Sequence, residues 1–266
     1  MFENQVVWIT GASSGIGEAL ALQFAAEGSK LVLCARREDQ LNRVKARCEE
    51  QRTPGDDVLV LPLDVTDEPA MPGALQRVLE TFERIDMLIN NAGISQRSMC
   101  IDTDMSVYRR LFEVDVFGQI ALTKTVLPVM LSQGSGHIAV TSSVAGKVGV
   151  PLRTGYCAAK HAVMGFFDAL RAETAHRGIK VTTFTPGYIR TEISLHALRG
   201  DGRQYGEVDD EIAGGMDATA CAQAIMAGLR KGEPEIAMGG KPEMQALLMK
   251  RLLPKLVFKR VAAMAR

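Results

Sequence analysis

The sequence predicts an α/β fold, in which a doubly wound parallel sheet carries helices on both faces. Three observations predict it: short apolar runs alternate with longer segments of helical periodicity, the runs are apolar throughout, and a glycine-rich turn follows the first run. Strands that are apolar on both sides are typical of a parallel sheet covered by helices. Because no proline- or serine-rich linker and no repeat interrupts the pattern, we expect a single domain over residues 1–240.

The apolar runs predict seven strands. The first, residues 5–10, is rich in β-branched and aromatic side chains and stops at a glycine. Further strands are expected at residues 31–35, 58–61, 87–90, 136–141, 179–184 and 235–238. Helical spacing of apolar residues predicts helices at residues 16–27, 38–51, 68–82, 104–131, 156–176 and 218–229. Right-handed crossovers between these elements make the strands parallel.

Two segments break this alternation. Residues 192–216 form a long, polar stretch that contains glycines, and such a loop in a compact domain is usually functional or disordered. We interpret it as a lid that closes on bound ligands, with a mobile surface excursion as the alternative. Residues 241–266 follow the last strand as a basic, apolar tail.

Composition excludes several classes of function. The chain has 266 residues with 31 basic and 31 acidic side chains, and a net charge of zero argues against a nucleic-acid-binding protein. The five cysteines are scattered without a C-x-x-C pair, so we expect no metal site and a reducing compartment. No apolar run reaches the roughly 20 residues that span a bilayer. Since the first residues also lack a secretory pattern, we expect a cytoplasmic protein.

The first predicted strand ends in a turn that suits a phosphate. Glycines follow Thr10 with the spacing G-x-x-x-G-x-G, and a helix follows them. Glycines allow close backbone approach, and the first turn of a helix offers unpaired N–H groups and positive potential to a pyrophosphate. We therefore predict a Rossmann-type dinucleotide site formed by Gly11, Ser13, Ser14, Gly15, Ile16 and Gly17.

The end of the second strand distinguishes between the two nicotinamide dinucleotides. An acidic residue there accepts a hydrogen bond from the ribose 2′-hydroxyl, whereas arginine pairs with a 2′-phosphate. Here Arg36 and Arg37 precede the first acidic residue, Glu38, so we expect NADP(H); solvated arginines at a helix start are the alternative. Residues after the third and fourth strands are further candidate cofactor contacts: Asp64, Val65, Asn91, Ala92 and Gly93.

A tyrosine and a lysine one helical turn apart are the candidate acid–base pair. Tyr156 and Lys160 occupy positions i and i+4 near the start of a predicted helix, and therefore share one face. An ammonium beside a phenol favours the phenolate, which a general acid/base at neutral pH requires. Ser143 follows the fifth strand, 13 residues before the tyrosine, where its hydroxyl would hold a carbonyl oxygen; ordinary turn chemistry is the alternative.

These motifs, with N-N-A-G at residues 90–93 and P-G-Y-I-R-T at residues 186–191, resemble the short-chain dehydrogenase/reductase superfamily from about residue 5 to residue 240. The stretches NNAGISQRS, GYCAAKHAVMGFFDALRAE and TPGYIRTEIS are similar to its branch of dehydrogenase/reductase members 7 and 7B. The resemblance implies additional contacts to the nicotinamide and its phosphates from Pro186, Gly187, Ile189 and Thr191.

The resemblance also implies a reaction, the interconversion of a carbonyl and a secondary alcohol by hydride transfer. In reduction Tyr156 would donate the proton, Lys160 would bind the nicotinamide ribose, and Ser143 would polarise the carbonyl. The implied substrate is small or hydrophobic, and the implied assembly is a homodimer or homotetramer. A nucleotide-binding regulator with little or no turnover is the alternative.

One position departs from the pattern of this superfamily. An asparagine usually lies in the long fourth helix, and Asp115 takes its place here. A carboxylate near Lys160 would offset the ammonium and weaken its effect on Tyr156, whereas a protonated carboxyl would behave as the amide does. We therefore include Asp115 among the candidate catalytic residues, and an attenuated rate remains open.

The zero net charge conceals a basic tail. The last 23 residues carry six basic and no acidic side chains, which leaves 25 basic and 31 acidic residues in the remainder. Mixed apolar and cationic residues are typical of an interfacial helix on an anionic membrane, here interrupted by Pro254. A helix packed on the protein or on a partner subunit is the alternative, and we slightly favour peripheral membrane contact.

Overall fold

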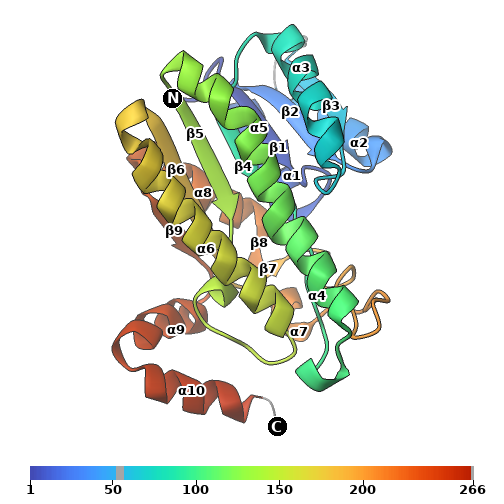
Figure 1. Ribbon diagram of the computed structural model, residues 1–266, viewed down its shortest axis with the longest axis vertical. Helices are drawn as coiled ribbons and strands as arrows, with labels where there is room; N and C mark the ends of the chain where they lie inside the picture. Colours follow the sequence, from blue (N-terminus) through green and yellow to red (C-terminus); the bar gives the residue numbers. More distant parts are fainter. Residues whose placement is uncertain (52–56, 265–266) are drawn as a thin grey trace.

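The computed structural model describes residues 1–51 and 57–264, and it confirms the α/β class (Figure 1). A parallel seven-stranded sheet has the order β3-β2-β1-β4-β5-β6-β9. Its strands are β1 (Val6–Thr10), β2 (Lys30–Ala35), β3 (Val58–Pro62), β4 (Met87–Asn90), β5 (Gly136–Thr141), β6 (Ile179–Pro186) and β9 (Glu235–Met238). Each strand lies within two residues of its predicted position.

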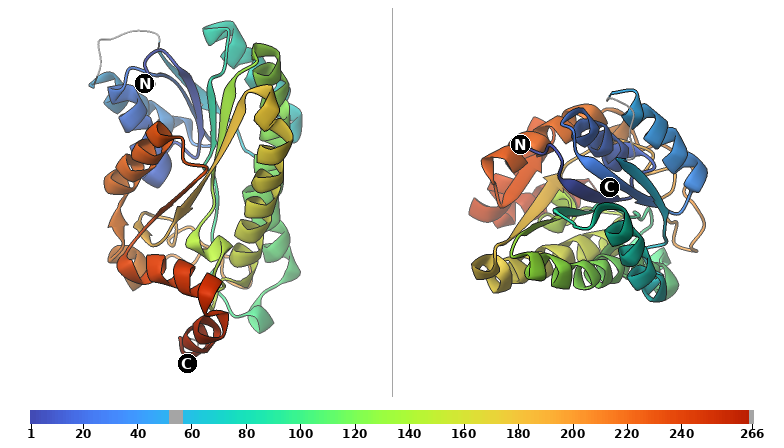
Figure 2. Two further views of the ribbon diagram at one scale, coloured as in Figure 1. Left: turned by 90° about the vertical axis from the view of Figure 1, so that its left-hand side faces the viewer. Right: turned by 90° about the horizontal axis from the view of Figure 1, so that it is seen from above.

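Helices cover both faces of the sheet (Figure 2). One face packs against α1 (Gly15–Ala26), α2 (Glu38–Glu49) and α8 (Ala218–Lys231). The other face packs against α3 (Met71–Phe82), α5 (Gly118–Gln133) and α6 (Thr154–Thr174). Along β1, Val7 and Ile9 join the first core, whereas Val6 and Trp8 join the second. Both sides of the strand are therefore buried, which explains why its sequence is apolar throughout.

The predicted helix 104–131 is one helical segment with an irregular centre. α4 (Met105–Phe112) runs through a π-helical turn (Glu113–Phe117) into α5. The segment Met105–Gln133 is long enough to cross a membrane, and an 18-residue window within it has a mean hydropathy of 1.4. Its buried Leu122, Val126 and Met130 instead lie in the core between α3, α6 and the sheet, and Val107 and Leu111 pack in a smaller cluster with Leu198. We therefore interpret it as a core helix, whose central turn positions Asp115.

The two segments outside the predicted alternation contain short elements. After β6 come β7 (Ile189–Arg190), α7 (Asp210–Ala213) and β8 (Met216–Asp217), with β7 and β8 paired in a small parallel sheet. The tail forms α9 (Lys241–Leu252) and α10 (Pro254–Ala263), and the proline ends one helix and begins the next. Short 3₁₀ turns lie at Glu68–Ala70, Cys100–Asp102, Val144–Gly146 and Ala175–Arg177. Figure 1 shows α9 and α10 at the carboxyl end of the sheet strands.

Candidate active site

The candidate site is an open cleft of about 1480 Å³ at the carboxyl ends of the strands. The chain runs from β1 outward to β3 and then returns to the other side of β1 at β4, so the order reverses between these strands. Ligands of open α/β sheets bind at such a reversal. All site residues predicted from the sequence line this cleft except Gly17 and Asp115.

The glycine turn has the backbone that its sequence predicts. Gly11 and Gly15 have φ angles of +65° and +58°, a region that side chains disfavour. A Cβ on Gly17 would lie 2.2 Å from the carbonyl oxygen of Gly11, so this glycine serves the packing of helix against turn. Ser14, at the N-cap of α1, makes no side-chain cap hydrogen bond. The first N–H groups of α1 are thus free of a side-chain cap, and the turn fits a pyrophosphate.

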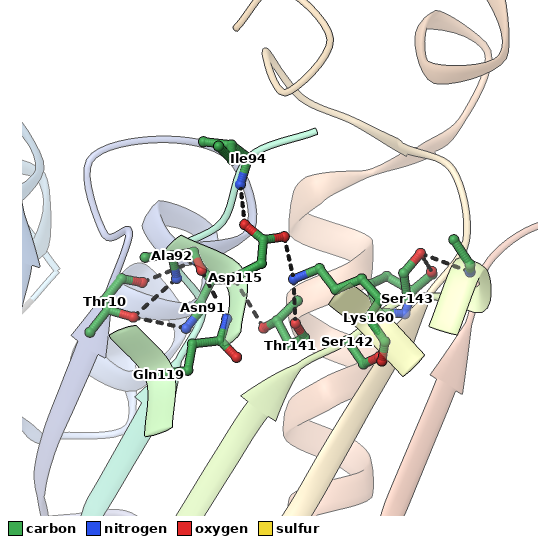
Figure 3. A network of polar contacts seen from close by, with 12 residues as sticks. Thr10, Asn91, Ala92, Ile94, Asp115, Gln119, Thr141, Ser142, Ser143 and Lys160 are labelled. Atoms are coloured by element: carbon green, nitrogen blue, oxygen red, sulfur yellow. Dashed lines mark hydrogen bonds and ion pairs between the residues drawn. The ribbon is translucent and has the colours of Figure 1, made fainter. Parts of the chain in front are cut away.

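A network of polar contacts fixes the loop after β4 to its neighbours (Figure 3). The Thr10 hydroxyl accepts hydrogen bonds from the backbone N–H groups of Asn91 (2.9 Å) and Ala92 (3.0 Å). The Asn91 amide donates to the Thr10 carbonyl (3.1 Å) and accepts from the Thr141 hydroxyl (3.1 Å). Gln119 on α5 donates to the carbonyl of Ala92 (3.0 Å). Three strand ends and a helix therefore hold the floor of the cleft rigid.

Lys160 is buried, and its ammonium contacts one backbone carbonyl and one carboxylate (Figure 3). Its ammonium donates to the carbonyl oxygen of Thr141 at 3.0 Å and lies 3.3 Å from Oδ2 of Asp115. The other oxygen of Asp115 accepts a hydrogen bond from the N–H of Ile94 at 2.8 Å. Lys160 Nζ also lies 5.6 Å from the ring centre of Tyr156. Asp115 is fully buried behind the lysine, which explains why it does not line the cleft.

The charges of this buried pair depend on each other. Burial raises the pKa of the Asp115 carboxyl, and the nearby Lys160 counteracts this only in part. Burial would lower the pKa of Lys160, but the charge of Asp115, with a smaller contribution from Tyr156, outweighs it and the net pKa is raised. We infer that Lys160 keeps its proton, and that the aspartate offsets part of its charge.

Ser143 combines a structural role with a place in the cleft. Its Oγ accepts a hydrogen bond from the N–H of Ala145 (3.1 Å) and donates to the carbonyl of Pro186 (3.3 Å). It therefore caps the 3₁₀ turn after β5, as the alternative interpretation expected. Ser143 also lines the cleft together with Tyr156 and Lys160, so the structure brings the predicted catalytic side chains to one cavity.

The two arginines after β2 line the outer part of the cleft and are exposed. Arg36 lies 4.0 Å from Asp64, a weak contact between side chains that are 67% and 42% exposed. Oδ1 of Asp64 is occupied by Thr66, whose N–H and hydroxyl both donate to it. Arg36 and Arg37 are therefore free to pair with a ligand phosphate.

Sequence reasoning did not single out a buried charge cluster at the edge of the cleft. Both carboxylate oxygens of Asp209 accept hydrogen bonds from Nε of Arg97, at 2.8 and 2.7 Å. Arg153, three residues before the candidate catalytic Tyr156, donates to the same aspartate at 3.0 Å. The three side chains are only 6–11% exposed. No spacing in the sequence links these positions, and the only signal was that Asp209 lies in the predicted lid segment.

This cluster fastens the lid segment, residues 192–216, to the opposite wall. Next to it, Leu198 donates from its N–H to the carbonyl of Ser95 and accepts at its carbonyl from the N–H of Arg97, both at 2.8 Å.

The C-terminal tail also reaches the cleft. Glu243 on α9 accepts a hydrogen bond from the N–H of Tyr188 (3.2 Å), and further tail residues line the cavity: Ala246, Val261 and Met264.

Comparison with known proteins shows which family the chain resembles. The sequence profile of the short chain dehydrogenase family matches residues 5–200. The chain is 40% identical over 266 residues to dehydrogenase/reductase SDR family member 7B of Bos taurus, covering 99% of this chain and 82% of that protein. It is 43% identical over 262 residues to a dehydrogenase/reductase SDR family protein 7-like of Drosophila melanogaster, covering 97% and 80%.

Solved structures show the same architecture. A short-chain dehydrogenase from Sphingobium yanoikuyae in complex with NADPH is 30% identical, with a TM-score of 0.75 over 88% of this chain and 87% of that one. A short chain dehydrogenase/reductase from Burkholderia phymatum in complex with NAD has a TM-score of 0.83 over 96% and 95%, at 24% identity. The second likeness bears on the fold alone.

Proposed function

Because the chain belongs to the short-chain dehydrogenase/reductase family of NAD(P)-dependent oxidoreductases, we propose that it interconverts a carbonyl and a secondary alcohol with NADP(H) as its cofactor. The observation that carries the proposal is the meeting of Ser143, Tyr156 and Lys160 in one cleft with the glycine turn. When bound, the nicotinamide supplies or accepts the hydride.

The side chains of the cleft perform the proton chemistry. In reduction, the hydroxyls of Ser143 and Tyr156 bind the carbonyl oxygen, and the tyrosine gives its proton to that oxygen as negative charge develops there. The Lys160 ammonium, oriented by the carbonyl of Thr141, stabilises the resulting phenolate. In oxidation the phenolate takes the proton from the alcohol.

The preference for NADP(H) is supported by the side chains after β2. Arg36 and Arg37 offer two exposed guanidinium groups at the cleft, and they precede the first acidic side chain after β2, Glu38. The Asp64 carboxylate accepts a hydrogen bond from the N–H of Thr66, and its distance of 4.0 Å from Arg36 is the longest at which two charged groups count as an ion pair. A 2′-phosphate would meet cations here, whereas a bare ribose would meet no dedicated carboxylate.

A small or hydrophobic, lipid-like substrate is supported by the apolar side chains that line the cleft. Apolar side chains from three segments contribute: Ile94, Val144, Val148, Val150, Leu198 and Met216. The family resemblance is the basis for proposing a homodimer or homotetramer, which light scattering would measure. A cytoplasmic location is proposed from the sequence pattern alone, and fractionation would test it. The competing function is a regulator that binds the cofactor without turnover. The observation that favours it is the ion pair between Asp115 and Lys160, because the carboxylate offsets the effect of the ammonium on Tyr156.

The substitution Tyr156→Phe tests the reaction. We expect NADPH absorbance to fall when wild-type protein meets ketones from a panel of graded chain length, and the variant to lose at least about 100-fold in turnover because it cannot transfer the proton. NADPH binding, followed by fluorescence, should remain as the control. Equal turnover by the variant would refute the assignment, and binding without oxidation of NADPH by the wild type would favour the regulator.

A further inference from the structure

The large apolar side chains that are exposed gather at one end of the described molecule. Of thirteen such residues, six lie on the α9–α10 hairpin: Leu248, Leu252, Leu253, Leu256, Phe258 and Met264. Three more belong to the loop that enters α4: Met99, Ile101 and Met105. Figures 1 and 2 show both segments at the carboxyl end of the sheet, with α10 farthest from it. We call this set of nine residues the apolar rim.

Basic side chains are interspersed with the apolar rim. The hairpin carries Lys250, Arg251, Lys255, Lys259 and Arg260 after its last acidic residue, Glu243. Within residues 1–51 and 57–264, no acidic side chain forms an ion pair with any of these five cations. Glu243 itself is directed to the backbone of Tyr188. Their charge is therefore not compensated inside the protein, and the surface suits an anionic partner.

The charge and the exposed apolar side chains of the apolar rim favour a membrane over a second copy of the chain as its partner. A symmetric contact between two hairpins would bring two sets of like charges together, which is unfavourable. A bilayer of anionic phospholipids offers phosphate and carboxylate groups to the cations and acyl chains to the apolar side chains. We propose that the apolar rim docks the protein on an anionic phospholipid bilayer.

The same hairpin forms part of the wall of the cleft. On α10, Val257, Val261 and Met264 follow one another at helical spacing, with Val257 buried and the other two lining the cavity. One side of α10 therefore faces the cleft, while Lys255, Lys259, Leu256 and Phe258 lie outside it. Docking holds the cleft beside the bilayer, and, resting on the proposed function, an apolar carbonyl compound enters it from the lipid.

Vesicle flotation of the full chain tests the docking. We compare vesicles of phosphatidylcholine alone with vesicles that also contain phosphatidylserine, and follow wild type against the double variant Lys255→Glu/Lys259→Glu. Both lysines are exposed and without a salt bridge in the described part of the chain, so the fold should be retained. The matched control is Arg177→Glu/Lys180→Glu, two exposed cations at the opposite end of the sheet, where β6 begins.

We expect wild type and control to float with the anionic vesicles, the binding to weaken in high salt, and the tail variant to bind at least roughly tenfold more weakly. A variant with intact charge, Leu252→Gln/Leu256→Gln, should also bind more weakly. Equal binding by the tail variant, or no binding by wild type, overturns the proposal. The proposal is also overturned if wild type does not bind vesicles and light scattering shows that the tail variants form a smaller oligomer than wild type.

Turnover separates this inference from the proposed function. With a long-chain ketone embedded in the anionic vesicles, Lys255→Glu/Lys259→Glu should be several-fold slower than wild type, whereas both should reduce a water-soluble ketone equally. If wild type floats with vesicles but reduces neither ketone, the docking stands and the proposed reaction fails. If both proteins reduce the embedded ketone at one rate, entry from the lipid is refuted.

Discussion

Asp115 couples the backbone of the helical segment to the chemistry of the cleft. It lies in the π-helical turn between α4 and α5, a local irregularity that often marks functional sites. From there its carboxylate reaches both the N–H of Ile94 and the ammonium of Lys160. An amide in this position would make the first contact but would leave the charge of the lysine whole. We therefore propose that Asp115 sets how strongly Lys160 acts on Tyr156.

The substitution Asp115→Asn tests that coupling. Removing a negative charge 3.3 Å from the ammonium lowers the pKa of Lys160 from its raised value, and the ammonium, held by the carbonyl of Thr141, then acts with its full charge on the phenolate of Tyr156. We expect the acidic limb of the pH–rate profile for alcohol oxidation to move down by roughly half to one pH unit. Asp201→Asn, at an exposed site in the lid segment, is the control. An unmoved limb would show that Asp115 serves only structure.

Among the elements, those with clear periodicity were predictable and those without it were not. The seven strands and six of the helical segments follow from apolar runs and 3.6-residue spacing, because burial on a sheet dictates both. The π turn leaves no such signal, since one extra residue in a helix does not change its composition. β7, β8 and α7 are each four residues or shorter, too short for any period to show.

The same contrast applies to the site. The glycine turn and the Tyr156–Lys160 pair are local in sequence, so spacing alone places them. The contacts of Asp209 with Arg97 and Arg153 join residues 112 and 56 positions apart and depend on how three loops meet. Likewise, the tail could be recognised as basic and apolar, but nothing in its sequence indicated that α9 and α10 line the cleft.

The lid segment should depend on its buried aspartate. Asp209→Asn leaves two buried guanidinium groups without their shared anion, and removing one partner of such a cluster costs about 3–5 kcal/mol. We expect the amides of residues 192–216 to exchange hydrogen faster and the KM for a carbonyl substrate to rise, with NADPH binding little changed. Asp201→Asn is the matched control, because its ion pair with Arg203 is exposed. Unchanged exchange would show that the cluster does not hold the lid.

At the scale of the whole molecule, the cleft is where the two halves of the sheet are joined. Loops from β1, β2 and β3 form one side, and loops from β4, β5 and β6 form the other, with the tail closing the end. Beyond the paired strands β1 and β4, Thr10 and Gly11 contact Asn91 and Ala92 across this boundary, and above these contacts lies the open space of about 1480 Å³. A dinucleotide that contacts both sides therefore adds stability that the protein alone lacks.

Thermal unfolding measures that contribution and the cofactor preference together. At 100 times its Kd, a ligand that binds only the folded state stabilises it by about 2.7 kcal/mol, which raises the Tm of a domain this size by about 5 °C. We expect NADPH to give such a shift and NADH, at the same concentration, a much smaller one. Arg36→Asp should reduce the shift with NADPH, because a carboxylate would repel the 2′-phosphate that the guanidinium attracts. Arg177→Asp, an exposed position far from the cleft, should behave as wild type. Equal shifts with both dinucleotides in the wild type would contradict the role of the arginines, while still placing a dinucleotide in the cleft.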